Sequence, residues 1–223
     1  MLANVEKTIS QFNNDLKVLF ESRITDIIIY GSVVRGGFNK NRSDIDFIVI
    51  LKDEITIMDI ESIEGLHRKY RATKNLTSIL EGRYLGLTNN VFVNGYYVGT
   101  NPKGWKQIGE IGFENIESAM ILDCYMTLYD SNILPSIIEY DWIKVHEEIV
   151  NQIDEFIDND LLSDNQRFVE YALSTSARSL YTYKEDAFIS KQKALKWIEH
   201  NYMILDYNNP KESLNKIRNL LGR

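Results

Sequence analysis

The hydrophobic pattern in the first half of the chain changes between helical and strand-like spacing. Apolar residues recur every three or four positions from Val5 to Phe20, which predicts an amphipathic helix over about residues 1–22. Short β-branched runs follow, of the kind that form buried strands. The remaining elements predicted here are strands at 24–30, 44–51 and 76–87 and a helix over 54–72.

A hairpin is predicted around Asn94-Gly95. This pair lies between the apolar runs 91–93 and 96–98, and Asn-Gly suits a tight turn in which both central residues take positive φ. The sheet would gain two strands in this way.

The second half of the chain has helical spacing throughout. Asp164 and Ser190 are candidate N-caps of two of its helices. The predicted fold class is therefore α+β, with a mixed-sheet domain over residues 1–110 followed by an all-helical domain over 111–223. The predicted helices of the second half are 114–130, 136–159, 164–184, 190–203 and 210–222.

The segment from Gly31 to Asp46 contains the candidate chemistry. A strand that ends in Gly31-Ser32 exposes backbone amides on a tight turn, where no side chain keeps a phosphate away. Asp44 and Asp46 are two residues apart on a strand, so both carboxylates point to the same face. Paired carboxylates favour a shared divalent cation, and magnesium prefers oxygen ligands together with substrate phosphates. A solvated strand edge is the alternative interpretation of the two aspartates.

This combination resembles the polymerase-β-like nucleotidyltransferase superfamily over about residues 24–85. Its signature is Gly-Ser, a short glycine-containing helix start, then Ser-Asp-x-Asp and an apolar strand, here Gly31-Ser32 and Ser43-Asp44-Ile45-Asp46. Within the superfamily the chain is similar to the aminoglycoside adenylyltransferases that modify streptomycin and spectinomycin. The C-terminal helical part adds to this likeness around Lys191.

The resemblance implies a role for each matched residue. Asp44 and Asp46 would hold Mg²⁺, and Glu81, on a neighbouring strand, would be the general base that takes the acceptor's proton. A structural alternative for Glu81 is pairing with Arg83 or a lysine. The residues expected to contact the nucleotide are Gly31, Ser32, Arg35, Ser43 and Lys191.

Trp105 is the candidate for stacking on the acceptor's ring. It follows the Gly-rich stretch near the predicted domain junction. Packing between elements is the alternative role for a lone tryptophan.

Charge and composition narrow the choice of partners. The net charge of -7 repels phosphate backbones, so nucleic acid is a poor partner and a cationic small molecule a good one. One cysteine, Cys124, excludes a disulfide framework within the chain and fits a reducing cytoplasm. No apolar run approaches ~18 residues, so no membrane span is expected. The sequence is compatible with a monomer or a homodimer.

The predicted function is magnesium-dependent transfer of AMP from ATP to a hydroxyl of an aminoglycoside-type antibiotic. Two alternatives stay open. The acceptor could instead be a lincosamide, a protein side chain or an RNA end, or the chain could be a nucleotide-binding sensor without catalysis. Pyrophosphate release that requires an acceptor would separate an enzyme from a sensor.

Overall fold

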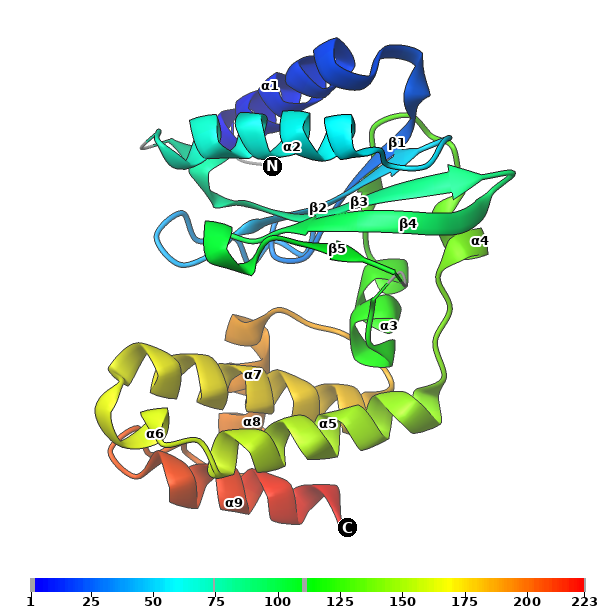
Figure 1. The fold of residues 1–223 in the computed structure, drawn as a ribbon. Helices are drawn as coiled ribbons and strands as arrows, with labels where there is room; N and C mark the ends of the chain where they lie inside the picture. Colours follow the sequence, from blue (N-terminus) through cyan, green and yellow to red (C-terminus); the bar gives the residue numbers. More distant parts are fainter. Residues whose placement is uncertain (1–2, 74, 110–111, 223) are drawn as a thin grey trace. The chain divides into compact units, whose positions relative to one another are not determined.

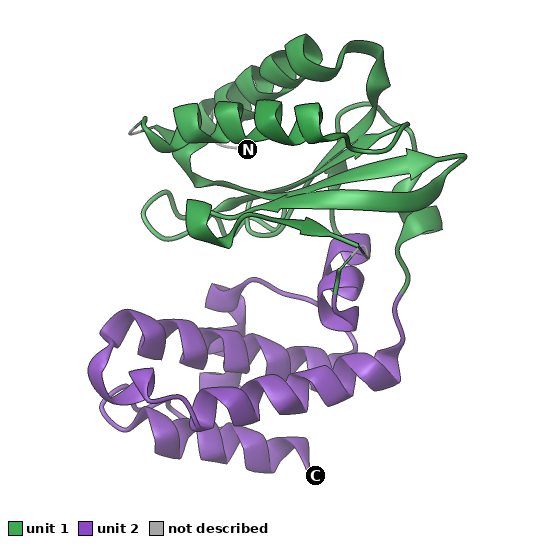
Figure 2. Cartoon of the chain, in the orientation of Figure 1, with its two compact units in different colours: residues 1–113, 124–139 green, residues 114–123, 140–223 purple. Residues whose placement is uncertain are grey.

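The chain forms two compact units (Figure 2). The structure, a computed structural model, describes residues 3–73, 75–109 and 112–222. Unit 1 comprises residues 1–113 and 124–139, and unit 2 comprises residues 114–123 and 140–223. The predicted boundary between residues 110 and 111 lies outside the described residues, as do the first two residues of the predicted N-terminal helix.

Unit 1 is built on a six-stranded mixed sheet of order β5-β4-β3-β2-β1-β6 (Figure 1). β2 and β3 run parallel, and the other neighbouring pairs are antiparallel. This confirms the mixed sheet of the predicted α+β fold. The strands are β1 (Ile24–Tyr30), β2 (Ile45–Leu51), β3 (Leu80–Thr88), β4 (Val91–Val98), β5 (Lys106–Ile108) and β6 (Met126–Thr127).

Two helices, α1 (Ala3–Phe20) and α2 (Ile57–Arg71), cover one face of this sheet (Figure 1). Alternate strand residues pack with them in one buried cluster, among them Phe47, Tyr84 and Tyr96. We call this side of the sheet the helix face. Along each strand, the residues that alternate with these point to the opposite side of the sheet, because successive side chains of a strand point to opposite faces. That opposite side carries Asp46 and Glu81, and we call it the carboxylate face.

The β3–β4 turn lies at Asn89-Asn90, so the hairpin predicted around Asn94-Gly95 is wrong. Both turn residues have positive φ, 52° and 63°, which asparagine tolerates well. Asn94 lies inside β4 instead, and its side chain bonds to the backbone N–H and carbonyl of Ile55. A side chain at Gly95 would come within 2.6 Å of Ile108 on β5, so this glycine serves close strand packing.

Residues 124–139 return to unit 1, which corrects the predicted helix over 114–130. The helix ends at Asp123, and β6 then pairs with β1. Asp26 on β1 is 1% exposed and fastens this segment. Its carboxylate accepts hydrogen bonds from the Thr127 hydroxyl, the Tyr129 N–H, and the N–H and hydroxyl of Ser131. A buried acid needs such donors, and here they come from about a hundred residues further along the chain.

Unit 2 is helical in its described residues. Ser190 accepts from the Lys193 N–H and caps α8, as predicted. The cap of α7 is Asn165 rather than Asp164, because Asp164 is the last residue of the preceding short helix. The helices outside the sheet-covering pair are α3 (Asn115–Asp123), α4 (Leu134–Ile137, in unit 1), α5 (Trp142–Ile157), α6 (Leu161–Asp164), α7 (Gln166–Glu185), α8 (Lys191–Asn201) and α9 (Pro210–Leu221), and short 3-10 helices span Glu21–Arg23, Leu76–Ile79 and Pro102–Gly104.

The core of unit 2 consists mainly of aliphatic and small side chains, most of them from α5, α7, α8 and α9. Val145, Ile149, Ile153 and Phe156 form the buried side of α5, and the acidic residues lie on its wet side. Across the described parts of the chain, no helix is both long and apolar enough to cross a membrane.

Candidate active site

The turn after β1 brings a glycine against a carboxylate. Gly31 has φ +70°, a conformation that glycine adopts without strain. A Cβ placed on Gly31 would lie 2.0 Å from Oδ2 of Asp46, so any side chain there would collide with the acid. The turn is closed by hydrogen bonds from the Arg35 N–H to the Gly31 carbonyl and from the Gly37 N–H to the Ser32 carbonyl.

Ser32 presents a hydroxyl that its surroundings do not use. Its Oγ is buried and has no hydrogen-bond partner among the described residues. Leaving such a group unsatisfied costs about 1–3 kcal/mol, so a ligand that accepts from it would gain free energy. The hydroxyl and the turn together form a small polar cradle beside Asp46.

Asp46 and Glu81 lie side by side on the carboxylate face. Their Cα atoms are register partners in the parallel β2–β3 pair, and Asp46 is also opposite Tyr30 on β1. Residues in register on neighbouring strands project to the same face. The structure thus places Glu81 next to Asp46, on the neighbouring strand where the resemblance expects a third carboxylate, and its role as a base stays a prediction.

Asp44 comes one residue before β2 and is half-buried. Burial, followed by the nearby negative charge of Glu81, raises the pKa of Asp44 to about 6, and the positive charge of Arg71 opposes this rise. Such mutual repulsion is what a bound cation would relieve. Within the described ranges, no group of three or more histidine, cysteine, aspartate or glutamate side chains forms a ready-made metal site.

Sequence reasoning missed Arg71, in the last turn of α2. Its guanidinium donates to the carbonyls of Leu80, Ser78 and Gly99, which surround the start of β3. Burial lowers the pKa of Arg71, while the charges of Glu81 and Asp44 act in the opposite direction. In the sequence it stands beside Arg68 and Lys69, and basic residues are ordinary at a helix C-terminus.

Ser43 closes the loop before the acids. Its Oγ accepts from the Asn39 N–H at 3.0 Å, and its own N–H donates to the Asn39 carbonyl at 2.8 Å. Lys191 begins α8 in unit 2, and its ammonium lies 4.2 Å from the centre of the Tyr171 ring. The contacts of Ser43 and Lys191 with a nucleotide stay predictions.

Trp105 lies on the helix face, away from the carboxylates. It packs against the buried cluster of that face, its indole donates to the Gly99 carbonyl at 2.8 Å, and the guanidinium of Arg68 lies over its ring. These contacts are those of a packing residue. The structure does not bring Trp105 to the acids as it does Glu81.

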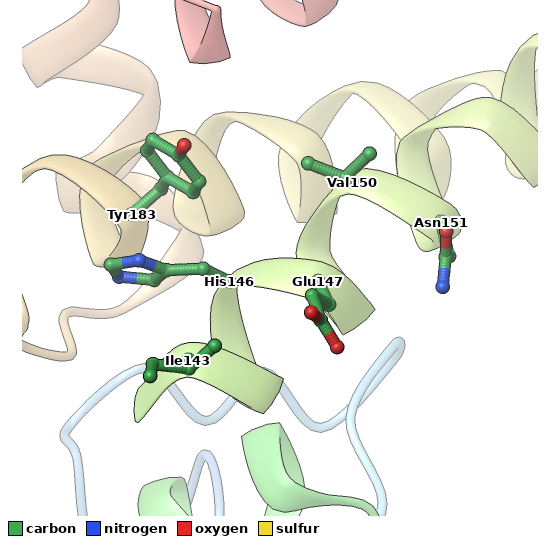
Figure 3. A pocket seen from close by; sticks show the side chains of 6 residues that line it. All are labelled: Ile143, His146, Glu147, Val150, Asn151 and Tyr183. Carbon is green, nitrogen blue, oxygen red and sulfur yellow. The ribbon is translucent and has the colours of Figure 1, made fainter. Parts of the chain in front are cut away.

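Unit 2 carries a shallow hollow of its own (Figure 3). The rings of His146 on α5 and Tyr183 on α7 are tilted against each other with centroids 4.4 Å apart, and His146 Nε2 donates a hydrogen bond to Asp186 Oδ1 at 2.9 Å. The side chains that line the hollow are Ile143, His146, Glu147, Val150, Asn151 and Tyr183. It does not include any of the residues that the motif singled out.

The chain's N-terminal part matches a known family. Residues 9–81 fit the family model described as the nucleotidyltransferase domain. The resemblance to nucleotidyltransferases is confirmed. The match spans about a third of the chain, and it runs through the Gly31 turn and both aspartates and ends at Glu81. No curated protein matches the chain.

The fold extends this likeness to the whole chain. It is similar to the crystal structure of spectinomycin adenyltransferase AAD(9) from Enterococcus faecialis, solved with ATP and spectinomycin. The TM-score is 0.68 and the sequence identity 15%, and the match covers 98% of this chain and 99% of that one. The chain thus has an adenyltransferase fold, with the helical part included.

Proposed function

We propose that this chain is a magnesium-dependent adenylyltransferase that moves AMP from ATP to a hydroxyl of a small, cationic, aminoglycoside-type molecule. The observation that supports this most is the pairing of Asp46 and Glu81 on one sheet face, directly beside the Gly31 turn. The nucleotidyltransferase match over residues 9–81 points to the same chemistry. The adenyltransferase of the same fold was solved with ATP and an antibiotic, which suggests the donor and the class of acceptor.

Asp44 and Asp46 suit magnesium. Both offer carboxylate oxygens, and magnesium is commonly held by one or two carboxylates together with substrate phosphates. The unused Ser32 hydroxyl lies in the same turn, where it can donate to a phosphate oxygen. When bound, magnesium would neutralise charge on the triphosphate and on the departing pyrophosphate.

The transfer itself is a substitution at the α-phosphorus of ATP. The acceptor's oxygen forms a bond to that phosphorus, and the bond from phosphorus to the α–β bridging oxygen breaks, which releases pyrophosphate. The acceptor's proton goes to the carboxylate of Glu81. General-base help of this kind contributes about 10²–10⁴ in rate. The Gly31 turn and Ser32 hold the phosphates in line for attack, which reduces the entropic part of the barrier.

The net charge of -7 favours a cationic acceptor, since opposite charge speeds encounter. Arg35, Ser43 and Lys191 are further nucleotide contacts in this proposal. A role for Trp105 in holding the acceptor has no support from its packing. A cytoplasmic location and a monomeric or homodimeric state stay predictions from the sequence.

The test is pyrophosphate release from ATP and magnesium across a panel of streptomycin, spectinomycin, other aminoglycosides and lincomycin. Asp46→Asn is the control, because it removes a charge and keeps the side chain's shape. Release with one drug that disappears in Asp46→Asn and on chelation of magnesium would support the proposal. Binding of ATP without release on the whole panel would contradict the antibiotic acceptor and favour a sensor.

A further inference from the structure

Both oxygens of the Glu81 carboxylate are held by donors from the end of β4. The Tyr97 hydroxyl donates to Oε1 at 2.5 Å, and the Thr100 N–H donates to Oε2 at 3.1 Å. A carboxylate with one bond on each oxygen has a fixed orientation. It still has lone pairs to accept another proton, because each oxygen offers about two acceptor sites.

The position of Tyr97 is set by the sheet. Tyr97 is the register partner of Arg83, two residues after Glu81 on β3, so its ring lies on the carboxylate face. The guanidinium of Arg83 lies over this ring, 5.7 Å from its centre. Gly99 leaves room for the hydroxyl, since a Cβ there would come within 3.0 Å of Tyr97 Oη.

The second donor, the Thr100 N–H, is held in place by hydrogen bonds to the carbonyl of the same peptide unit. The Thr100 N–H and the Gly99 carbonyl belong to one planar peptide unit. That carbonyl accepts from Arg71 Nη2 at 2.9 Å and from Trp105 Nε1 at 2.8 Å. Two donors on the carbonyl side therefore orient the N–H toward Glu81, which gives Arg71 and Trp105 a part in the arrangement without contact with substrate.

We propose that Tyr97 is a positioning residue for Glu81. Its hydroxyl keeps the carboxylate in the orientation from which it takes the acceptor's proton. This inference rests on the proposed function, in which Glu81 is the base. Small misplacements of a reacting group reduce rates strongly, so the loss of one of the two bonds should appear in kcat rather than in ATP binding.

The neighbouring residue gives a matched control. Tyr96 also donates to a glutamate at 2.5 Å, but its partner is Glu64 on α2, on the helix face. Tyr97→Phe and Tyr96→Phe thus remove the same atom from the same strand, on opposite faces. We expect Tyr97→Phe to lower kcat about tenfold to a hundredfold with an unchanged KM for ATP, and Tyr96→Phe to leave kcat within about twofold.

A double-mutant cycle with Glu81→Gln decides whether Tyr97 acts through Glu81. We expect Tyr97→Phe to change kcat less than about twofold in the Glu81→Gln background, because the base it positions is already gone. An equal loss in both backgrounds, or a normal kcat in Tyr97→Phe, would overturn the inference. Full activity in Glu81→Gln would instead overturn the proposed base, and the inference with it.

Discussion

Each face of the unit 1 sheet has a tyrosine hydroxyl that donates to a glutamate, but the two glutamates have different surroundings. On the helix face the Tyr96 hydroxyl binds Glu64, which also pairs with Arg68 at 2.8 Å. Hydrogen bonds from Tyr96 and Arg68 lower the pKa of Glu64, as expected for a satisfied structural acid. On the carboxylate face the Tyr97 hydroxyl binds Glu81, whose neighbours include the acids Asp44 and Asp46.

The difference between the faces shows that position, not residue type, distinguishes a structural acid from a candidate catalytic one. The helix face holds a stacked aromatic cluster in which Phe47, His67 and Tyr84 are all fully buried. The carboxylate face brings like charges together beside a glycine turn, an arrangement that costs stability without a ligand. Such a local conflict is typical of a functional site.

The largest effect is expected from removing the charge of Asp46. Asp46→Asn should lower AMP transfer on the order of 10³-fold, because the variant loses a carboxylate that would hold magnesium, whose charge would stabilise the transition state. Initial rates of pyrophosphate release measure it. The matched change on the other face is Asp15→Asn, which alters an acid that accepts from Tyr70. Equal losses in both variants would mean that the faces do not differ in function.

Two glycines of the same turn separate the effect of backbone conformation from the effect of a steric collision. Gly31 and Gly36 have φ of +70° and +72°, but a Cβ at Gly36 would meet no atom within 4 Å. Gly36→Ala should therefore cost about 1–2 kcal/mol for its backbone alone. Gly31→Ala adds a collision with Asp46, so it should unfold at lower denaturant than Gly36→Ala and lose transfer at least about tenfold more. Similar unfolding and transfer in the two variants would refute the close contact.

The buried His67 on the helix face should make the free energy of unfolding depend on pH. Burial lowers the pKa of His67 from its usual 6.5 to about 3, so the folded state resists protonation. Between pH 6.5 and pH 3 this histidine binds a proton in the unfolded state and not in the folded state. The free energy of unfolding is therefore not reduced by His67 above pH 6.5, and it decreases as the pH falls toward 3. At pH 5 this one group should cost about 2 kcal/mol relative to pH 7.

Denaturant unfolding of the wild type and of His67→Gln at pH 5 and pH 7 measures this contribution as the difference between the two proteins. The raised pKa of Asp44 favours the folded state as the pH falls over the same range, so it opposes the effect of His67 and is present in both proteins. His200→Gln, at an exposed position, should keep the pH dependence of the wild type. A wild-type-like pH dependence in His67→Gln would show that another group is responsible.

The smallest effect is expected from Trp105→Phe. The ring's packing against the buried cluster stays, and the hydrogen bond to the Gly99 carbonyl is lost, which costs about 1 kcal/mol of unfolding free energy. The KM for the acceptor should stay the same, because Trp105 lies on the helix face. A large rise in that KM with normal stability would restore the stacking role considered from the sequence.

Local patterns predicted most elements because each depends on nearby residues. The strand predicted over 24–30 and the Ser190 cap formed as expected, and the helix predicted over 136–159 formed from Trp142 onward. The hairpin prediction at Asn94-Gly95 was wrong because these residues serve contacts with distant parts of the chain. Asn94 hydrogen-bonds to Ile55 and Gly95 packs against Ile108, and no local pattern reveals either contact. The helix predicted over 114–130 failed for a similar reason, since Asp26 draws residues 127–131 to β1.

The candidate site was predictable as far as its motif extends. Gly31, Ser32, Asp44 and Asp46 belong to one continuous stretch, and Glu81 followed from the resemblance. Arg71 and Tyr97 carried no signal, because a basic helix end and an aromatic strand residue are common everywhere. Their significance depends on register and on which carbonyls they meet.

The measurement that tests the central claim most directly is transfer of a labelled phosphate. The chain would be incubated with magnesium, ATP labelled at the α-phosphorus, and the acceptor that gives pyrophosphate release. The account predicts label on the acceptor with the wild-type chain and with Tyr96→Phe, and its loss with Asp46→Asn and Glu81→Gln. Label transferred equally by Asp46→Asn and Glu81→Gln would contradict a reaction on the carboxylate face.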